Sequence, residues 1–445
     1  MASTYLSKTF GTATDRKKWT FSAWVKRSTF AVGEAIFASY AEATQSWYSR
    51  ISDNGNGKFD FSEYDNSSYV INLRPNALLR DVNGWYHLVL KYDSAQATAS
   101  DRVKYYVNGE QITSWSSETY PSQNQESGIN KAQAHTIGKN LAGPDGYYFN
   151  GYMAHFHFCD GYAYDASTFG ETDATTGIWK PITEPSVNYG NNGFFLKFEN
   201  SGSMGLDSSG NSNNFAVNGN LTQTVDTPTN VYAVLNILNP QASGYTIANG
   251  NLSVTANASD TWRTTYSTIG ASSGKWYWEQ KITNFTGVDP HYIGIVSEDQ
   301  MNSSNIDQAS TSRGYFYTAT GAKRTNNAQV SYGDSWTTGD IVGVAMDLDN
   351  NKLYFSKNGT WQNSGDPTSG ATGTGSAFDI TSGYVYLAST STYYSGNTYQ
   401  MNFGNGYFGT TPVSSAGSNG NGSIFEYDVP TGYYALNTKN LATYG

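Results

Sequence analysis

Residues 339–361 read GDIVGVAMDLDNNKLYFSKNGTW, and this stretch predicts a β-hairpin. Apolar residues in 342–346 alternate with small ones, which is the two-residue period of a half-buried strand. Residues 349–351 (DNN) favour a turn, because Asn and Asp tolerate left-handed backbone conformations. The alternation resumes in 352–356, and Asn-Gly at 358–359 predicts a second tight turn.

The composition of the whole chain agrees with an all-β protein. Of its 445 residues, 35 are Tyr and 46 are Gly, while only 14% are charged, which favours strands joined by many turns. A formal net charge of −10 argues against nucleic acid as a partner, because phosphate binding needs clustered Lys and Arg. Cys159 is the single cysteine, so no intrachain disulfide can form. No signal peptide and no apolar run long enough to span a membrane are evident.

The hairpin belongs to an ordered series of strand motifs in the second half of the chain. Residues 274–282 (GKWYWEQKI), 292–296 (YIGIV), 384–388 (YVYLA) and 400–405 (QMNFGN) accompany it. In this order the motifs resemble the SPRY (B30.2) family, whose members are β-sandwich binding modules. The resemblance implies that the hairpin is scaffold and that recognition lies in the loops.

The first half resembles a different sandwich family. Residues 20–26 (TFSAWVK), 85–93 (WYHLVLKYD), 103–109 (VKYYVNG) and 149–164 follow one another as short strands with Gly and Asn turns. They are similar to the concanavalin A-like (LamG/pentraxin) jelly roll. Residues 93–109 also parallel 347–359, since in both a strand ending in Asp is followed by a Tyr-containing strand ending in Asn-Gly.

The segment between the halves carries a further resemblance. It contains residues 169–181 (FGETDATTGIWKP), 189–198 (YGNNGFFLKF), 205–215 (GLDSSGNSNNF) and 226–230 (DTPTN), followed by LNILNP at 235–240. This string resembles structural proteins of tailed, often marine, bacteriophages, in which a LamG-like domain precedes a SPRY domain.

We therefore predict an all-β fold of two tandem concanavalin A-like jelly-roll β-sandwiches, LamG-like then SPRY, with a short C-terminal tail. The predicted boundaries are 1–226 for the LamG-like sandwich, 227–240 for a connector, 241–412 for the SPRY sandwich, 413–423 for a flexible Gly/Ser/Asn linker and 424–445 for a C-terminal docking segment. The only helix candidates are single turns, such as residues 165–169. The apolar residues of the tail are expected to dock on the sandwich or on a neighbouring chain.

Catalytic and metal sites are weak alternatives. Sandwich glucanases use a Glu-x-Asp-x-x-Glu motif, which is absent; Asp60 with Glu63 and Glu426 with Asp428 lack its spacing. His155, His157 and Cys159 would share one strand face and could bind zinc, although core packing of Phe156 and Phe158 explains the pattern better. Asp207, Asn211 and Asn213 could bind calcium, but a polar turn is the favoured interpretation. We therefore expect no enzyme activity and no obligatory cofactor.

Ligand binding is expected at aromatic and Arg residues in long polar stretches and sandwich loops, including 260–266, 298–313 and 389–397. The candidates are Trp47, Tyr48, Tyr64, Trp115, Tyr147, Tyr148, Trp262, Arg263, Arg313, Tyr315, Tyr393 and Tyr394. For each of them the alternative is packing within the core or between the sheets; for Trp276 and Trp336 core packing is the expectation.

The resemblance implies a non-enzymatic protein of the virion surface, made in the bacterial cytoplasm. As a tail fibre, capsid fibre or decoration protein it would bind host-surface glycan or protein weakly but in many copies. Its other partners would be virion proteins and further copies of itself, with no nucleic acid and no membrane insertion. The alternatives are a capsid or tail cement protein without host binding, and a polysaccharide-degrading enzyme.

Overall fold

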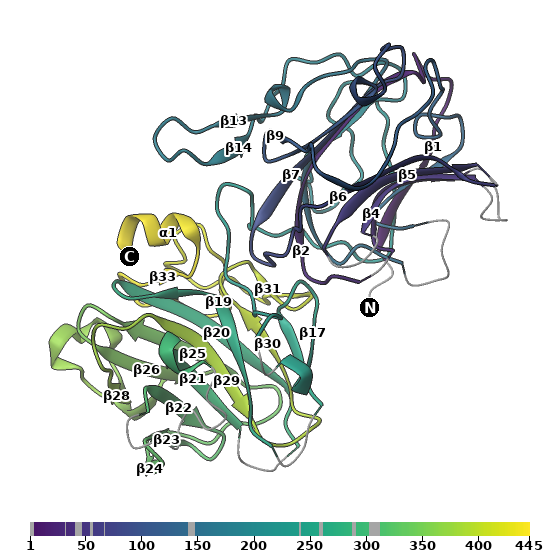
Figure 1. The fold of residues 1–445 in the computed structure, drawn as a ribbon. Helices are drawn as coiled ribbons and strands as arrows, with labels where there is room; N and C mark the ends of the chain where they lie inside the picture. The colour runs from purple at the N-terminus through teal and green to yellow at the C-terminus, as the bar shows by residue number, and fades with distance from the viewer. Residues whose placement is uncertain are drawn as a thin grey trace. The chain divides into compact units, whose positions relative to one another are not determined.

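The chain folds into two compact units, Met1–Gln223 and Thr224–Gly445. The computed structural model describes residues 4–31, 33–40, 47–53, 57–65, 67–140, 147–239, 242–257, 261–286, 291–301 and 312–445. Each unit is a sandwich of two β-sheets (Figure 1). The predicted all-β fold with two sandwiches is confirmed.

The larger sheet of the first unit has eight antiparallel strands in the order β10-β6-β5-β4-β3-β11-β1-β16. Their bounds are Trp115–Thr119, Tyr69–Pro75, Phe59–Asp65, Trp47–Asp53, Ala35–Tyr40, Ala134–Ile137, Tyr5–Thr9 and Ala216–Asn218. The six-stranded sheet has the order β15-β12-β2-β7-β8-β9. Its strands are Phe194–Leu196, Gly151–Asp160, Lys18–Arg27, Trp85–Asp93, Val103–Val107 and Glu110–Gln111.

Aromatic side chains fill the space between these two sheets. Trp19 and Phe21 of β2 are fully buried, and Trp19 stacks on Tyr92 of β7 with ring centroids 5.1 Å apart. Phe37 and Phe61 reach this core from the larger sheet. The hairpin β13 (Gly170–Thr172) and β14 (Trp179–Pro181) covers part of the other face of the six-stranded sheet, where Trp179 Nε1 donates to Nδ1 of buried His87 at 3.0 Å. Short 3₁₀ turns lie at Ala99–Asp101 and Ala166–Thr168, the second within the predicted 165–169.

The second unit repeats the two-sheet plan. Its nine-stranded sheet follows β17-β18-β30-β20-β25-β26-β27, with β28 paired to β26 and β33 to β20. These strands are Tyr245–Ala248, Ser253–Ala256, Thr398–Asn402, Lys275–Asn284, Ile341–Asp347, Lys352–Lys357, Thr360–Trp361, Phe378–Asp379 and Tyr434–Ala435. The six-stranded sheet follows β19-β29-β21-β22-β23-β24. Its strands are Arg263–Ala271, Tyr386–Thr392, His291–Ser297, Gly314–Thr318, Ala322–Thr325 and Ala328–Ser331.

The hairpin predicted from residues 339–361 forms the adjacent strands β25 and β26 of the nine-stranded sheet. Val342, Val344 and Met346 are buried in the core, as the alternation predicts. Asn351 has φ of 57°, and Asn358 and Gly359 have φ of 47° and 80°, so both predicted turns use the left-handed conformation. Trp276 and Trp336 are core residues, also as expected.

Two predicted boundaries differ from the structure. Part of the expected connector 227–240 belongs to the second sandwich, because Ala233, Val234 and Leu235 lie in its core. The expected flexible linker 413–423 folds back on the tail: Gly417 N donates to Phe425 O at 2.9 Å, and Val429 N donates to Ser418 O at 3.0 Å. Its many Gly and Asn residues supply turns here, so composition alone misjudged its order.

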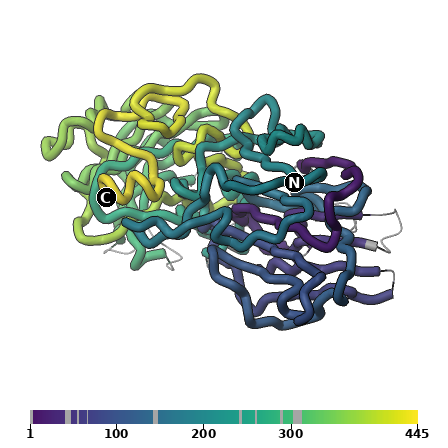
Figure 2. The backbone as a smooth tube through the Cα atoms, turned by 90° about the horizontal axis from the view of Figure 1, so that it is seen from above, coloured from purple at the N-terminus to yellow at the C-terminus, as the bar shows by residue number. Residues whose placement is uncertain are grey.

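The C-terminal segment docks on its own sandwich, one of the two outcomes expected for it. β33 pairs in parallel with β20, and the single α-helix of the described ranges, α1 (Thr438–Tyr444), follows it. Figure 2 shows this part in yellow, folded along the second unit. Further 3₁₀ turns of the unit are Ala242–Gly244, Glu298–Gln300, Gln362–Ser364 and Pro367–Thr372, and a small hairpin joins β31 (Tyr407–Phe408) to β32 (Thr411–Pro412). No helix in the described ranges is long and apolar enough to cross a membrane.

Candidate ligand-binding site

Four tyrosines form a row across four neighbouring strands of the larger sheet of the first unit. The strand register places Tyr40 opposite Tyr48, Tyr48 opposite Tyr64, and Tyr64 opposite Tyr69. Directly opposed residues share a sheet face, and this face is the outer one, because Ile51 and other odd-numbered residues of β4 and β5 turn toward the core. We call Tyr40, Tyr48, Tyr64 and Tyr69 the tyrosine row.

A β-bulge completes this row. Glu63 pairs with Ile71, but the next residue, Tyr64, pairs with Tyr69, so Val70 is the extra residue of β6. Without the bulge Tyr64 would face Val70 instead of a fourth tyrosine. The bulge therefore sets the composition of this part of the outer face.

Three rings of the row, those of Tyr48, Tyr64 and Tyr69, pack on one another. Tyr48 and Tyr64 stack with centroids 5.6 Å apart and an interplanar angle of 13°. Tyr69 meets Tyr64 edge to face at 5.3 Å, and the Tyr48 hydroxyl donates to the Tyr69 hydroxyl at 3.2 Å. Burial raises the pKa of the Tyr48 phenol, so it stays a neutral hydrogen-bond donor at physiological pH.

Arg50 extends the row at Tyr48. Its guanidinium carbon lies 4.6 Å from the centroid of the Tyr48 ring, a cation–π contact. Arg50 lies opposite Ser62 of β5 and Ala38 of β3, so it shares the outer face with the tyrosines.

A pocket of about 320 Å³ opens beside the row, at the end of the sandwich. We call it the rim pocket. Its lining residues are Arg16, Tyr48, Ser49, Glu63, Tyr64, Asp65, Val70, Gln125, Glu126, Gly128, Lys131 and Gln133. Tyr48 and Tyr64 thus belong to both the row and the pocket, which makes the two one continuous candidate site.

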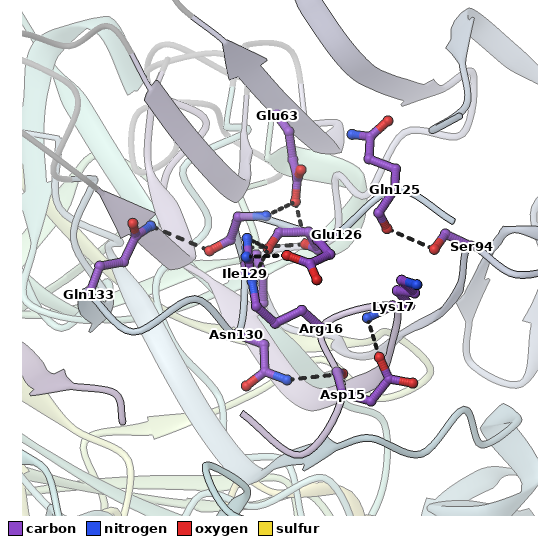
Figure 3. Close-up of polar contacts among 12 residues, drawn as sticks. Asp15, Arg16, Lys17, Glu63, Ser94, Gln125, Glu126, Ile129, Asn130 and Gln133 are labelled. Atoms are coloured by element: carbon purple, nitrogen blue, oxygen red, sulfur yellow. Dashed lines mark hydrogen bonds and ion pairs between the residues drawn. The ribbon is translucent and has the colours of Figure 1, made fainter. Parts of the chain in front are cut away.

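One wall of the pocket is the segment of residues 125–133, which we call the closing segment (Figure 3). Arg16 fastens it from outside, since Nη1 lies 2.6 Å from Glu126 Oε2 and Nη2 donates to Ser127 O at 2.7 Å. Tyr92 and Ser94 hydroxyls donate to the Gln125 carbonyl at 2.9 and 2.7 Å. The pocket wall is therefore built by specific hydrogen bonds.

The buried carboxyl of Glu63 binds the same closing segment by hydrogen bonds. Its Oε1 accepts from the Ser127 hydroxyl and, at 3.0 Å, from the Gly128 backbone N–H. Burial raises the pKa of the Glu63 carboxyl, and these hydrogen bonds oppose that rise. A Cβ at Gly128 would come within 2.0 Å of Ser49 Oγ, so a larger residue there would force the Ser49 side chain to move.

The second unit gathers a smaller aromatic group from the predicted residues. Trp262 lies 4.8 Å from Tyr292 and 5.5 Å from Tyr393, and Tyr393 lies 5.1 Å from Tyr394, as ring centroid distances. The structure thus brings Trp262, Tyr393 and Tyr394 together. The rim pocket belongs to the first unit, where it adds a concave surface to the aromatic residues.

The remaining candidates of the second unit have internal roles. Tyr315 is 6% exposed and lies in the core, which is the alternative given above for each candidate. Arg313 pairs with Asp299 and lies 4.2 Å from the Tyr384 ring. The side chain of Arg263 packs closely against Gly244: a Cβ on Gly244 would lie 2.4 Å from Arg263 Cδ. Much of the predicted loop 298–313 lies outside the described residues.

Four candidates of the first unit lie apart from the row or cannot be placed. The side chain of Trp47 lies outside the described residues, although its backbone begins β4. Trp115 stacks on buried Tyr105 at 6.4 Å and packs against the core. Tyr148 shares Lys139 with Tyr5, at 5.2 and 4.7 Å from the two ring centroids. Tyr147 packs against Gly33.

The metal candidates are occupied by protein contacts. A β-bulge with φ of 44° at His155 interrupts the strand alternation that would have aligned it with His157 and Cys159. The described ranges contain no group of three or more His, Cys, Asp or Glu suited to a metal. Asp207 accepts from Phe195 N, Ser209 N, Ser209 Oγ and Asn213 N, which is the geometry of a polar turn. Asn211 and Asn213 donate side-chain N–H groups to backbone carbonyls.

Sequence reasoning missed Arg50, Tyr69, Glu63 as a pocket residue, and Lys131. Tyr69 begins β6, but its place in the row depends on a bulge that no local motif indicates. A search for strands whose Tyr residues could align across a meander would have found 48, 64 and 69 together. Lys131 lies far along the chain, and only the closing segment brings it to the pocket.

The architecture defines a class: a mostly β protein of two tandem β-sandwich domains with a short C-terminal helix. Residues 2–168 match the family described as the concanavalin A-like lectin/glucanases superfamily, and residues 275–406 match the SPRY domain family. The chain therefore carries a concanavalin A-like (LamG) domain followed by a SPRY domain, as predicted.

Individual relatives resemble parts of the chain. The chain is 29% identical over 125 residues to the ATP-dependent RNA helicase DDX1 of Xenopus laevis; the match covers 27% of this chain and 16% of the helicase. The crystal structure of the SPRY domain of human HERC1 is 19% identical, covers 38% of this chain and 92% of its own, and has a TM-score of 0.29. A crystal structure of a human SPRY domain is 14% identical, with 36% and 94% covered and a TM-score of 0.27.

Proposed function

We propose that this chain is a non-enzymatic surface protein of a tailed-phage virion that binds host-surface glycan through its first unit. The observation that carries the binding role is the tyrosine row with its adjoining rim pocket. Phenol hydroxyls, amides and carboxylates around a pocket of this size suit a hydroxyl-rich ligand. The connector resemblance supports the virion origin, and multiple copies on a particle would turn weak contacts into firm attachment.

Binding without catalysis is supported by the state of the pocket carboxyls. Glycoside hydrolysis needs two free carboxyl groups about 5–10 Å apart around the bond. Glu126 is paired with Arg16, and Glu63 accepts hydrogen bonds from the closing segment. Both carboxyls therefore hold the pocket wall, which leaves Asp65 as the one further pocket carboxyl where hydrolysis needs two.

The test is binding of the purified chain to an array of bacterial surface polysaccharides. We expect binding that is lost in Tyr64→Ala and kept in Tyr444→Ala, which removes a 44% exposed tyrosine of the second unit. A chain that binds no glycan, or equal binding by both variants, would contradict the proposed site. Release of reducing sugar from a bound polysaccharide would overturn the non-enzymatic role.

A second candidate role is cementing of virion proteins without host binding. The docked C-terminal segment favours this role because it covers the apolar outer face of the second unit. Locating the protein by electron microscopy of the particle distinguishes the two. Copies buried between capsid subunits would support cement, and copies projecting from capsid or tail would support host binding.

A further inference from the structure

Arg50 forms no ion pair among the residues that the structure describes. Arg16, Arg27 and Arg74 of the same unit each pair with a carboxylate, on Glu126, Asp53 and Asp60. Arg50 has no ion pair with any residue in the described ranges, and its Nε is buried without a hydrogen-bond partner. An unpaired guanidinium held against a ring, with donors in a planar fork, is suited to binding a carboxylate or sulfate.

Lys131 adds a second unpaired cation to the site. It lines the rim pocket together with Tyr48, is exposed, and forms no ion pair in the part of the chain that the structure describes. The backbone around it is fixed, because Lys131 N donates to Gly128 O at 3.4 Å and Gln133 N donates to Lys131 O at 2.8 Å. The ammonium group is therefore carried on a fixed part of the pocket wall.

Two cations without an ion pair among the described residues lie near Tyr48, in a chain whose net charge is −10. Arg16 is neutralised by Glu126, and Asp65 is the remaining pocket carboxylate, which accepts from Ser67 Oγ at 3.3 Å. Glu63 is engaged by the Ser127 hydroxyl and the Gly128 N–H. Arg50 and Lys131 are thus cations of the site that no carboxylate of the described residues pairs with.

The ring geometry also favours polar recognition over stacking. The faces of Tyr48 are engaged by Tyr64 and Arg50, and Tyr69 meets Tyr64 edge to face. These contacts use ring faces within the row, which leaves less open ring face for a neutral sugar to stack on. Resting on the proposed glycan binding, we infer that the ligand is an acidic glycan whose carboxylate or sulfate groups bind Arg50 and Lys131.

The test compares matched polymers: dextran, dextran sulfate and polygalacturonate, titrated calorimetrically with the full chain. Arg50→Met keeps the apolar stem on Tyr48 and removes the charge; we expect its Kd for the acidic polymer to rise about tenfold or more. Lys131→Met should raise that Kd by a smaller factor, and added salt should weaken wild-type binding. Arg324→Met is the matched control, because it removes a cation 5.5 Å from the Tyr292 ring in the second unit.

Each outcome decides one point. Binding of dextran sulfate alone assigns sulfate, and binding of polygalacturonate alone assigns carboxylate. Equal losses in Arg50→Met and Arg324→Met would overturn the inference, because they indicate non-specific charge. Arg50→Lys, which keeps the charge, should recover part of the affinity if Arg50→Met is destabilised. If the chain binds neutral dextran through Tyr64 and shows no preference for acidic polymers, this inference is overturned while the proposed glycan binding stands. If the chain binds no glycan at all, both the inference and the proposed glycan binding are overturned.

Discussion

The outer faces of the two larger sheets differ in burial: the chain covers part of one face, and the other face stays partly exposed. In the second unit, Tyr277, Ala345 and Tyr354 form an apolar outer face, and Phe425, Val429, Tyr433 and Ala435 of the C-terminal segment bury it. In the first unit, the corresponding face carries the tyrosine row, and its members stay partly exposed, Tyr69 to 40%. An apolar face is covered by the chain itself, while a face of phenol hydroxyls and Arg is left to meet solvent or a ligand.

The cover of the second unit is fixed by one buried carboxyl. Glu279 accepts from the backbone N–H groups of Glu426 and Tyr427, each at 2.9 Å, and from the Tyr277 hydroxyl at 3.1 Å. The tail is thus held both by apolar burial and by a polar anchor beneath it. The tyrosine row has no such anchor for a cover among the described residues.

The largest expected effect comes from uncovering the second face. Phe425 is 1% exposed and packs edge to face on Tyr277 at 4.9 Å. Phe425→Ala should lower the free energy of unfolding of the second unit by about 3–5 kcal/mol, because it leaves a cavity. Urea unfolding followed by tryptophan fluorescence measures this. Leu238→Ala, at a 56% exposed residue, is the control and should change it by less than about 0.5 kcal/mol; equal effects would contradict the covering role.

The second expected effect is a dependence on pH. Burial raises the pKa of Glu279 to about 7 from its ordinary 4.5. The folded protein therefore binds this proton more tightly, so stability of the docked tail falls as pH rises from about 4.5 to about 7, by on the order of 3 kcal/mol at most. Hydrogen exchange of the Glu426 and Tyr427 amides should accelerate across this window beyond the intrinsic pH effect. Glu279→Gln should abolish that extra acceleration; an unchanged profile would show that Glu279 does not hold the tail.

The sandwiches were predictable because their strands are defined by local patterns. Alternation in 342–346 and Asn-Gly turns at 108–109 and 358–359 need only neighbouring residues, and the structure places each as predicted. Ordering of residues 413–423 was not predictable, because it depends on hydrogen bonds to 425–429 that composition does not reveal.

The candidate site was predicted only in part, for a related reason. Tyr48 and Tyr64 stood out as aromatic residues in polar stretches, but aromatic type does not tell a surface residue from a core residue, as Tyr315 shows. The register across four strands, the bulge at Val70 and the return of the closing segment are long-range features. They decide which residues meet, and a single sequence does not encode them in any local motif.

A smaller effect is expected at the wall of the rim pocket. Ser127 is fully buried and its hydroxyl donates to Glu63. Ser127→Ala should lower the free energy of unfolding of the first unit by about 1–2 kcal/mol, because the buried carboxyl loses a donor. Thermal unfolding measures this, with Ser116→Ala on exposed β10 as the control. A loss no larger than the control's would show that the closing segment is held without Glu63.

The smallest effect on stability, and the sharpest contrast with Phe425→Ala, is expected in the tyrosine row. Tyr69→Ala removes a partly exposed ring and one hydroxyl contact to Tyr48, so the free energy of unfolding should change by no more than about 1 kcal/mol. Tyr69→Ala should weaken glycan binding by more than its small effect on the free energy of unfolding can explain, because the row presents its hydroxyls to the ligand. Urea unfolding and calorimetric titration of the same preparation measure the two quantities. A loss of stability near that of Phe425→Ala would show that the row, like the covered face, serves mainly to hold the sandwich together.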